Sequence, residues 1–338
     1  MTQLAPPLSP EPTIATAPRG SARRAYIAAV AVFLTGLGFS CYTSTAAVLA
    51  ALNDLSSSVA TWYNDNFGLL AAIPLAGGLL AAGALVLLPA RTQRRTLPDA
   101  MRIPAAILHA AAAAGLATWF ILSPLPTTSM LGHDALMAAV TVYLGALLML
   151  RWNLSLRQAG LRPRVDRPES VAVFAWSWMG LAVASALFEV LTTDLSPVMI
   201  SDQVSGGGSP LWYSAVDSLA NAVLEEVGCV VLVCLALERA GRRRWEILAV
   251  AGVMRVLMHG YYGWGSLGAL AFGVPNAYLY LTRRRLVPLI AAHTVIDTVA
   301  FSGLSVGQRF LFGLFGGVLL WGLTWALFRP ATAARAEA

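Results

Sequence analysis

Two adjacent glutamates, Glu225 and Glu226, lie inside an apolar segment, residues 221–237, that is long enough to cross a bilayer. A carboxylate at that depth is costly, so it usually faces a polar interior and serves a function. Two histidines follow in later apolar segments, His259 and His293, and each has a polar residue one helical turn away. A carboxylate pair followed by two histidines indicates chemistry that activates water inside a membrane.

The two glutamates are neighbours on one predicted helix, about 100° apart, so they cannot both face lipid. A carboxylate held away from bulk water makes a useful general base toward a single water molecule, and we expect Glu225 in this role. Glu226 is expected to orient its neighbours, with Arg255 balancing its charge. The alternative is a purely structural pair that arginine and hydroxyl groups satisfy.

The two histidines each belong to a pair of residues spaced four apart. The pairs are Arg255-Val-Leu-Met-His259 and His293-Thr-Val-Ile-Asp297. Because residues four apart share a helix face, Asp297 could hold His293 in one tautomer. A single histidine in a membrane helix more often joins two helices by a hydrogen bond. Two of them after a Glu-Glu helix favour a catalytic role.

This order of motifs resembles the CPBP family, which includes type II CAAX prenyl endopeptidases and bacteriocin-processing or immunity proteins. The family motifs are Glu-Glu-x-x-x-Arg, Phe-x-x-x-His and His-x-x-x-Asn/Asp. Glu225-Glu226, His259 and His293-Thr-Val-Ile-Asp297 match them in order. The resemblance covers about residues 171–328 and implies an intramembrane endopeptidase that hydrolyses a membrane-associated substrate.

The resemblance also implies roles for the matching residues. In the family the first glutamate activates water, and the histidines and the final Asn or Asp act around the scissile carbonyl. The motifs leave open whether the enzyme is glutamic or uses a divalent metal such as zinc, for which Glu225, His259 and His293 would be the ligands. The predicted catalytic set is Glu225, His259, His293 and Asp297, with Glu226 and Arg255 as supporting residues.

Two positions depart from the family motifs. The family arginine falls at Val230, and the family phenylalanine falls at Arg255. Because Arg255 lies on the next predicted span, we expect it to reach Glu226 and replace the missing arginine. If it does not, a non-catalytic scaffold or immunity protein is the alternative. A proton-coupled transporter with a Glu and His relay is a further one, although the two halves of the chain show no clear inverted repeat.

The elements that position these residues are predicted to be membrane helices. The chain has 338 residues, of which 57% are hydrophobic and 12% are charged. The charged fraction is about half the roughly 25% that is usual in soluble proteins. The apolar runs also far exceed the roughly ten residues of a membrane strand. We therefore predict an all-α, polytopic transmembrane helical bundle.

A transmembrane helix needs roughly 20 apolar residues, which gives about ten spans here. The predicted organisation is a disordered tail at 1–22, four additional spans within 23–170, a protease core at 171–328 and a short tail at 329–338. The segment Gly260–Gly268 could be a turn sunk into the protein. The predicted spans are 25–50, 67–90, 103–124, 135–152, 171–191, 214–237, 247–263, 265–281, 286–302 and 308–328.

Basic residues predict the orientation of the bundle. Arginines follow the second, fourth, sixth and eighth spans, so these loops and both termini are expected on the cytoplasmic side of a bacterial cell membrane. The net charge of +6 therefore indicates orientation, not a nucleic-acid partner. The expected partners are membrane lipids and a peptide or protein substrate. The arginines are Arg91, Arg94, Arg95 and Arg102, then Arg157, Arg162, Arg164 and Arg167, then Arg239, Arg242, Arg243 and Arg244, and last Arg283, Arg284 and Arg285.

Overall fold

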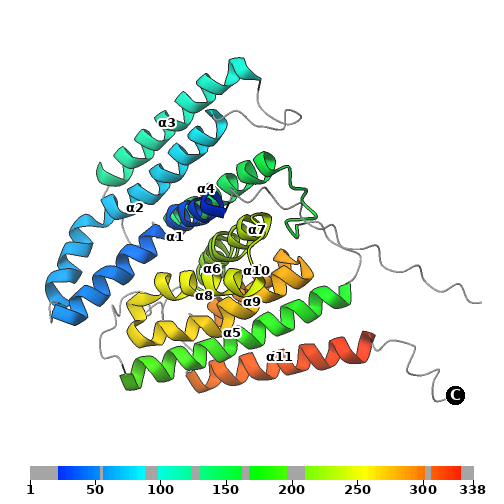
Figure 1. The fold of residues 1–338 in the computed structure, drawn as a ribbon. Helices are drawn as coiled ribbons and strands as arrows, with labels where there is room; N and C mark the ends of the chain where they lie inside the picture. Colours follow the sequence, from blue (N-terminus) through cyan, green and yellow to red (C-terminus); the bar gives the residue numbers. More distant parts are fainter. Residues whose placement is uncertain are drawn as a thin grey trace, which may run out of the picture.

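The computed structural model describes residues 22–53, 56–87, 98–122, 130–161, 167–195, 210–300 and 306–328. Within these ranges the chain forms helices joined by turns, without a strand, as predicted for an all-α bundle (Figure 1). The predicted tails at 1–22 and 329–338 lie outside the described residues, apart from the first residue of the first helix.

The described helices follow the predicted spans closely. Six long helices are α1 (Ala22–Asn53), α2 (Ser56–Leu87), α3 (Asp99–Leu122), α4 (Met130–Trp152), α5 (Arg167–Leu195) and α11 (Val306–Phe328). The span that carries the two glutamates is continuous but has three parts: α6 (Leu211–Glu225), the π-helix η5 (Glu226–Val231) and α7 (Leu232–Arg239). The remaining elements are α8 (Arg244–Met258), the 3₁₀ segment η6 (Gly260–Ala269), α9 (Leu270–Arg283) and α10 (Leu286–Ala300).

The connection between α8 and α9 differs from the predicted spans. The sequence predicted spans at 247–263 and 265–281, but α8 ends at Met258 and the 3₁₀ segment η6 follows. Gly263 breaks the helical path because its φ of 59° and ψ of −130° suit a residue without a side chain. The segment η6 packs against α1 and α5, so the predicted turn is a folded segment with one buried side, while Trp264 and Leu267 are exposed.

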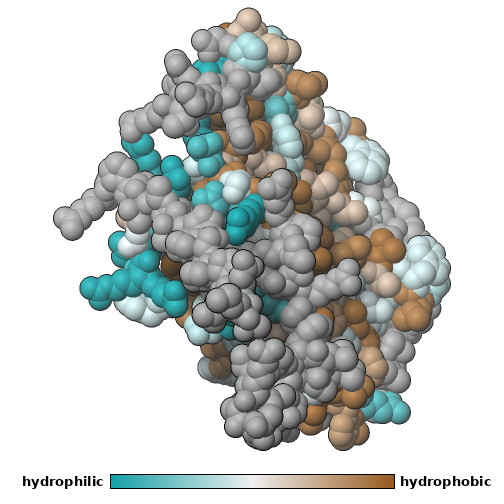
Figure 2. Space-filling view, turned by 90° about the vertical axis from the view of Figure 1, so that its right-hand side faces the viewer, coloured by the Kyte–Doolittle hydropathy of each residue, from teal (hydrophilic) through white to brown (hydrophobic). Residues whose placement is uncertain are grey.

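The helices form a multi-pass membrane protein. Five of the described helices, α2 to α5 and the span α6–α7, are long and apolar enough to cross a membrane. Large apolar side chains on their outer faces are exposed, for example Ile103 at 65% and Leu108 at 70%. Figure 2 shows apolar residues over much of one flank and hydrophilic residues gathered on the other side of the view. Lipid is the solvent that suits such a surface.

The span α6–α7 is the centre of the bundle. Helices α1, α4, α9 and α10 all pack on it. The pair α2–α3 lies at one edge of the molecule and the pair α5–α11 at the opposite edge (Figure 1). A Cβ atom added to Gly36 of α1 would lie 2.5 Å from Thr141 Oγ1 of α4 and 2.9 Å from Leu224 Cδ1 of α6. Two of the four additional spans therefore pack directly against the central helix.

Charged residues join several helix ends at one end of the bundle. Arg285 donates to Glu169 at 2.8 Å, and Arg284 pairs with Glu238, so the turn after α9 is tied to the start of α5 and the end of α7. The backbone N–H of Leu286 donates to the carbonyl oxygen of Gly160 at 3.3 Å. The basic loops that the structure describes therefore lie at one end, as their alternation predicted, while the loop at 88–97 lies outside the described residues.

The orientation can be tested with single cysteines. The predicted orientation places an introduced Arg243→Cys on the cytoplasmic side and Trp212→Cys, at the opposite end of the central span, outside. A membrane-impermeant thiol reagent added to intact cells should label Trp212→Cys and leave Arg243→Cys unlabelled until the cells are broken. Labelling of Arg243→Cys in intact cells would contradict the orientation.

Candidate active site

Glu225 and Glu226 lie at the junction where α6 becomes the π-helix η5. A π-helical turn bonds residue i to i+5 instead of i+4, and such turns are frequent at functional sites. Both side chains point into the protein, with exposed fractions of 2% for Glu225 and 0% for Glu226. The wider turn therefore coincides with the point at which two consecutive carboxylates are buried.

Arg255 of α8 binds both glutamates. Its Nη1 donates to Oε2 of Glu225, and its Nη2 donates to Oε1 of Glu226 at 2.5 Å. The guanidinium is fully buried, and its planar fork suits two acceptors at once. The expected contact between Arg255 and Glu226 is confirmed, whereas the contact with Glu225 was not expected from the sequence.

Two residues of α9 position the side chain of Arg255. The ring of Phe272 lies 4.8 Å from the guanidinium carbon, close enough for a cation–π contact. Gly273 leaves room for the aliphatic stem, because a Cβ atom there would lie 2.6 Å from Arg255 Cγ. The position of the guanidinium thus depends on the packing of α8 against α9.

His293 of α10 lies between three carboxylates. Its Nδ1 is 2.9 Å from Oε1 of Glu226, and its Nε2 is 3.3 Å from Oδ2 of Asp297 and 3.8 Å from Oε2 of Glu225. A neutral imidazole has one donor, so it can satisfy the acceptors on only one side. The geometry therefore suits an imidazolium, which donates at both nitrogens and balances part of the buried negative charge.

Two asparagines complete the cluster, and the sequence analysis missed both. Asn221 Nδ2 donates to Oε1 of Glu225 at 2.9 Å and to Oδ2 of Asp297 at 3.3 Å. Asn276 Nδ2, which is fully buried, donates to Oε1 of Glu226 at 3.2 Å. The signal for Asn221 was its place four residues before Glu225, on the same helix face. The signal for Asn276 was an amide in an otherwise apolar span.

His259 stands apart from this cluster. It ends α8, and its Nδ1 lies 2.9 Å from the carbonyl of Arg255, so Nδ1 carries the proton and Nε2 the lone pair. Its ring lies 5.5 Å from Phe188 and 6.1 Å from Phe272. Phe272 is also 5.7 Å from the ring of His293. Both histidine rings thus lie next to the same phenylalanine.

The predicted metal ligands do not assemble in this arrangement. Among the residues that the structure describes, no group of three or more His, Cys, Asp or Glu side chains is placed to hold a metal ion. Arg255 donates to one oxygen of each glutamate. Glu225, His259 and His293 do not form such a group as they stand, and a metal ion held by them stays a prediction.

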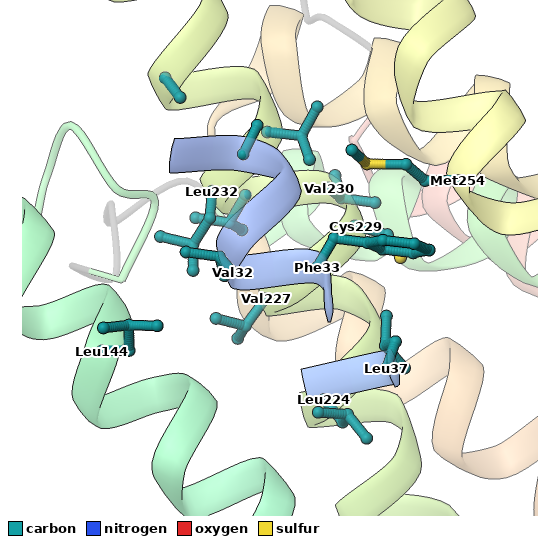
Figure 3. Packing of buried hydrophobic residues seen from close by; sticks show 14 of the residues in the cluster. Val32, Phe33, Leu37, Leu144, Leu224, Val227, Cys229, Val230, Leu232 and Met254 are labelled. Atoms are coloured by element: carbon teal, nitrogen blue, oxygen red, sulfur yellow. The ribbon is translucent and has the colours of Figure 1, made fainter. Parts of the chain in front are cut away.

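Val230, the position of the family arginine, is an apolar core residue. It is fully buried and belongs to the main hydrophobic core together with Phe33 of α1 and Met254 of α8 (Figure 3). A charged side chain at this position would have to enter that core. The cation that serves the glutamates therefore comes from α8, not from their own helix.

Comparison with protein families agrees with this site. Residues 207–299 match the family described as type II CAAX prenyl endopeptidase Rce1-like. This match supports membership of the CPBP family. The matched residues run from just before α6 almost to the end of α10, so they include both glutamates, both histidines and Asp297. Comparisons with curated proteins and with solved structures gave no match.

The buried ion pairs predict a large effect of removing the guanidinium. Arg255→Met keeps an unbranched stem but leaves two buried carboxylates without their cation, which should lower the free energy of unfolding by about 3–5 kcal/mol. Arg242→Met is the matched control, since Arg242 forms a partly exposed pair with Glu246 that is worth about 0–1 kcal/mol. Denaturant unfolding in detergent measures both, and equal losses would contradict the central role of Arg255.

The close approach at Gly273 predicts a second effect. Gly273→Ala should push the Arg255 stem away and lower the free energy of unfolding by about 1–3 kcal/mol. Gly77→Ala in α2 is the control, because a Cβ atom there meets nothing within 4 Å and alanine favours a helix. The same unfolding assay compares the two variants. A Gly273→Ala protein as stable as the Gly77→Ala protein would show that α8 and α9 are not packed this closely.

Proposed function

We propose that the protein is an intramembrane endopeptidase that hydrolyses a peptide bond of a membrane-associated substrate. The observation that supports this most is the convergence of Glu225, Glu226 and His293 from two helices in one buried cluster. The cluster lies inside the segment that matches an endopeptidase family. Charged groups in a membrane core are costly, so several of them gathered in one site indicate a catalytic role.

Glu225 is the proposed general base. A carboxylate has about four lone-pair sites, and Arg255 and Asn221 each use one. A remaining site can accept a hydrogen bond from water. As the water oxygen attacks the carbonyl carbon, Glu225 takes the proton, and it returns this proton to the amide nitrogen when the C–N bond breaks. The carboxyl thus acts first as a base and then as an acid.

His293 is proposed to stabilise the oxyanion that forms on the carbonyl. An imidazolium held between Glu226 and Asp297 is a preorganised positive charge next to Glu225. Asp297 fixes the ring orientation. His259 also lies next to Phe272, and its Nε2 can contact the substrate and, once protonated, polarise the same carbonyl. Arg255 and His293 supply the positive charge in these steps.

The location of the reaction follows from the bundle. We place the protein in the bacterial cell membrane, with its arginine-rich end in the cytoplasm. A helical bundle that packs around α6–α7 keeps the cluster away from bulk water, so only a few water molecules need to reach Glu225. The substrate class is a peptide or protein in or near the bilayer, and the family description does not by itself assign a prenylated substrate.

One observation favours a second candidate, a non-catalytic member of the family. Arg255 engages both glutamates, including the proposed base. If this pairing persists in the presence of substrate, the cluster is a structural joint between α6, α8 and α10. The chain would then serve as a scaffold or immunity protein.

Glu225→Gln separates the two candidates. The substitution keeps the shape and the hydrogen bond from Asn221 but removes the base, so turnover should fall by about 10²–10⁴-fold. The assay uses purified protein in liposomes with an internally quenched peptide library, with and without a chelator. Glu246→Gln on α8 is the control and should keep full activity.

The assay has two adverse outcomes. Full activity in the Glu225→Gln protein would contradict the mechanism, while a wild-type protein that is inert on every peptide would favour the non-catalytic candidate. His293→Ala should reduce turnover as much as Glu225→Gln, and Asp297→Ala should reduce it less because it acts through His293.

A further inference from the structure

The polar residues of α6 lie on one side of the helix. Taken at about 100° per residue, Ser214, Asp217, Ser218, Asn221 and Glu225 share an arc of about 100°. We name these five residues the polar arc. Large apolar residues of the same helix lie on its opposite side and are exposed; they are Trp212 at 65%, Val216 at 47% and Leu219 at 47%. The arc faces α4 and α10, and the opposite side faces lipid.

Near the start of α6, the polar arc carries polar atoms that lack a hydrogen-bond partner among the described residues. Oδ1 of Asp217 and Oγ of Ser218 are buried and have no hydrogen-bond partner among the described residues. Ser218 is fully buried. Buried polar atoms nearly always have a partner, and water supplies it when the protein does not. Two such atoms on one arc therefore point to water beside α6.

Acidic residues from two neighbouring helices meet the polar arc at the same level. Asp134 of α4 and Asp297 of α10 are the acidic side chains close to Asp217, and Asn221 of the arc donates to Asp297 at 3.3 Å. Three acids at one level of a membrane bundle are costly in a dry environment, and hydration lowers that cost.

The polar arc leads from one end of the bundle to Glu225. Asp217 is eight residues before Glu225, about 12 Å along the helix, and Asn221 lies halfway and hydrogen-bonds to Glu225. Beyond the glutamates the span changes character, because residues 227–237 are apolar or small and buried throughout. Figure 3 shows Val227, Cys229, Val230 and Leu232 of this part packed against α1. Within this span, the polar residues are thus continuous on the α6 side of the glutamates only.

We propose that the polar arc lines a hydrated path through which water reaches Glu225 from the end of the bundle where α6 begins. This end is opposite the arginine-rich one, so the path opens on the non-cytoplasmic side. The proposal rests on the proposed function only for the use of the water, as the second substrate of hydrolysis. Asp134 and Asp217 would line the entrance of the path, and Asn221 would connect the path to Glu225.

Cysteine accessibility tests the path without any peptide substrate. Ser218→Cys is close to isosteric, and Leu219→Cys, the next residue along the same helix, is its matched control at the same depth in lipid. A charged, membrane-impermeant methanethiosulfonate is added to intact cells, and the parent chain gives the background from Cys41, Cys229 and Cys234. Only a thiolate reacts, so a thiol at the water path should react on the order of tenfold or more faster than a thiol in lipid.

The outcomes decide the proposal. Faster labelling of Ser218→Cys than of Leu219→Cys from outside supports the path, and Asp217→Cys, paired with Val216→Cys, repeats the comparison if Ser218→Cys does not fold. Equal rates in both pairs would overturn it, as would labelling of the arc only from the cytoplasmic side in inverted vesicles. Because the assay does not measure hydrolysis, a protein that is labelled but inert keeps the path and loses the proposed function.

Discussion

The ion pair network of Arg255 with Glu225 and Glu226 is the interaction on which the rest of the structure depends. Two carboxylates buried at the centre of a membrane bundle are strongly unfavourable unless a cation and hydrogen-bond donors offset their desolvation. Arg255 supplies the cation, and Asn221, Asn276 and His293 surround the carboxylate oxygens. Helices α6, α8, α9 and α10 must therefore keep one relative position, because each contributes a partner.

The same network holds a conflict between stability and chemistry. A base must offer a lone pair to water, yet the cation that allows Glu225 to be buried in charged form also engages one of its oxygens. The division of labour between the two glutamates reduces this conflict. Glu226 has contacts with Arg255, Asn276 and His293, whereas Glu225 is the one that Asn221 links to the polar arc. All three contacts of Glu226 are made at its Oε1, which suits a structural role, and Glu225 is the carboxylate to which the proposed water path leads.

The departures from the family motifs have a simple physical meaning in three dimensions. An arginine four residues after the glutamate pair would reach it along the same helix, but Val230 at that position packs in the apolar core. Arg255 reaches the same carboxylates from the adjacent helix, at the position where the motif has phenylalanine. An aromatic ring is still present beside His259, because Phe272 of α9 contacts it, along with His293 and Arg255. Charge and aromatic contact are kept, but different helices supply them.

The sequence by itself determined the all-α membrane class, nearly all helix positions and the order of the motifs, because bilayer thickness and the cost of buried charge act on each segment separately. It also predicted the Arg255–Glu226 contact from charge balance. Only the tertiary structure decided that Arg255 binds Glu225 as well, that Asn221 and Asn276 join the cluster, and that both histidines lie next to Phe272. These contacts depend on the rotation of each helix about its axis, on the π-helix at Glu226 and on the 3₁₀ segment after His259. Packing between helices sets all three, and no single segment carries that information.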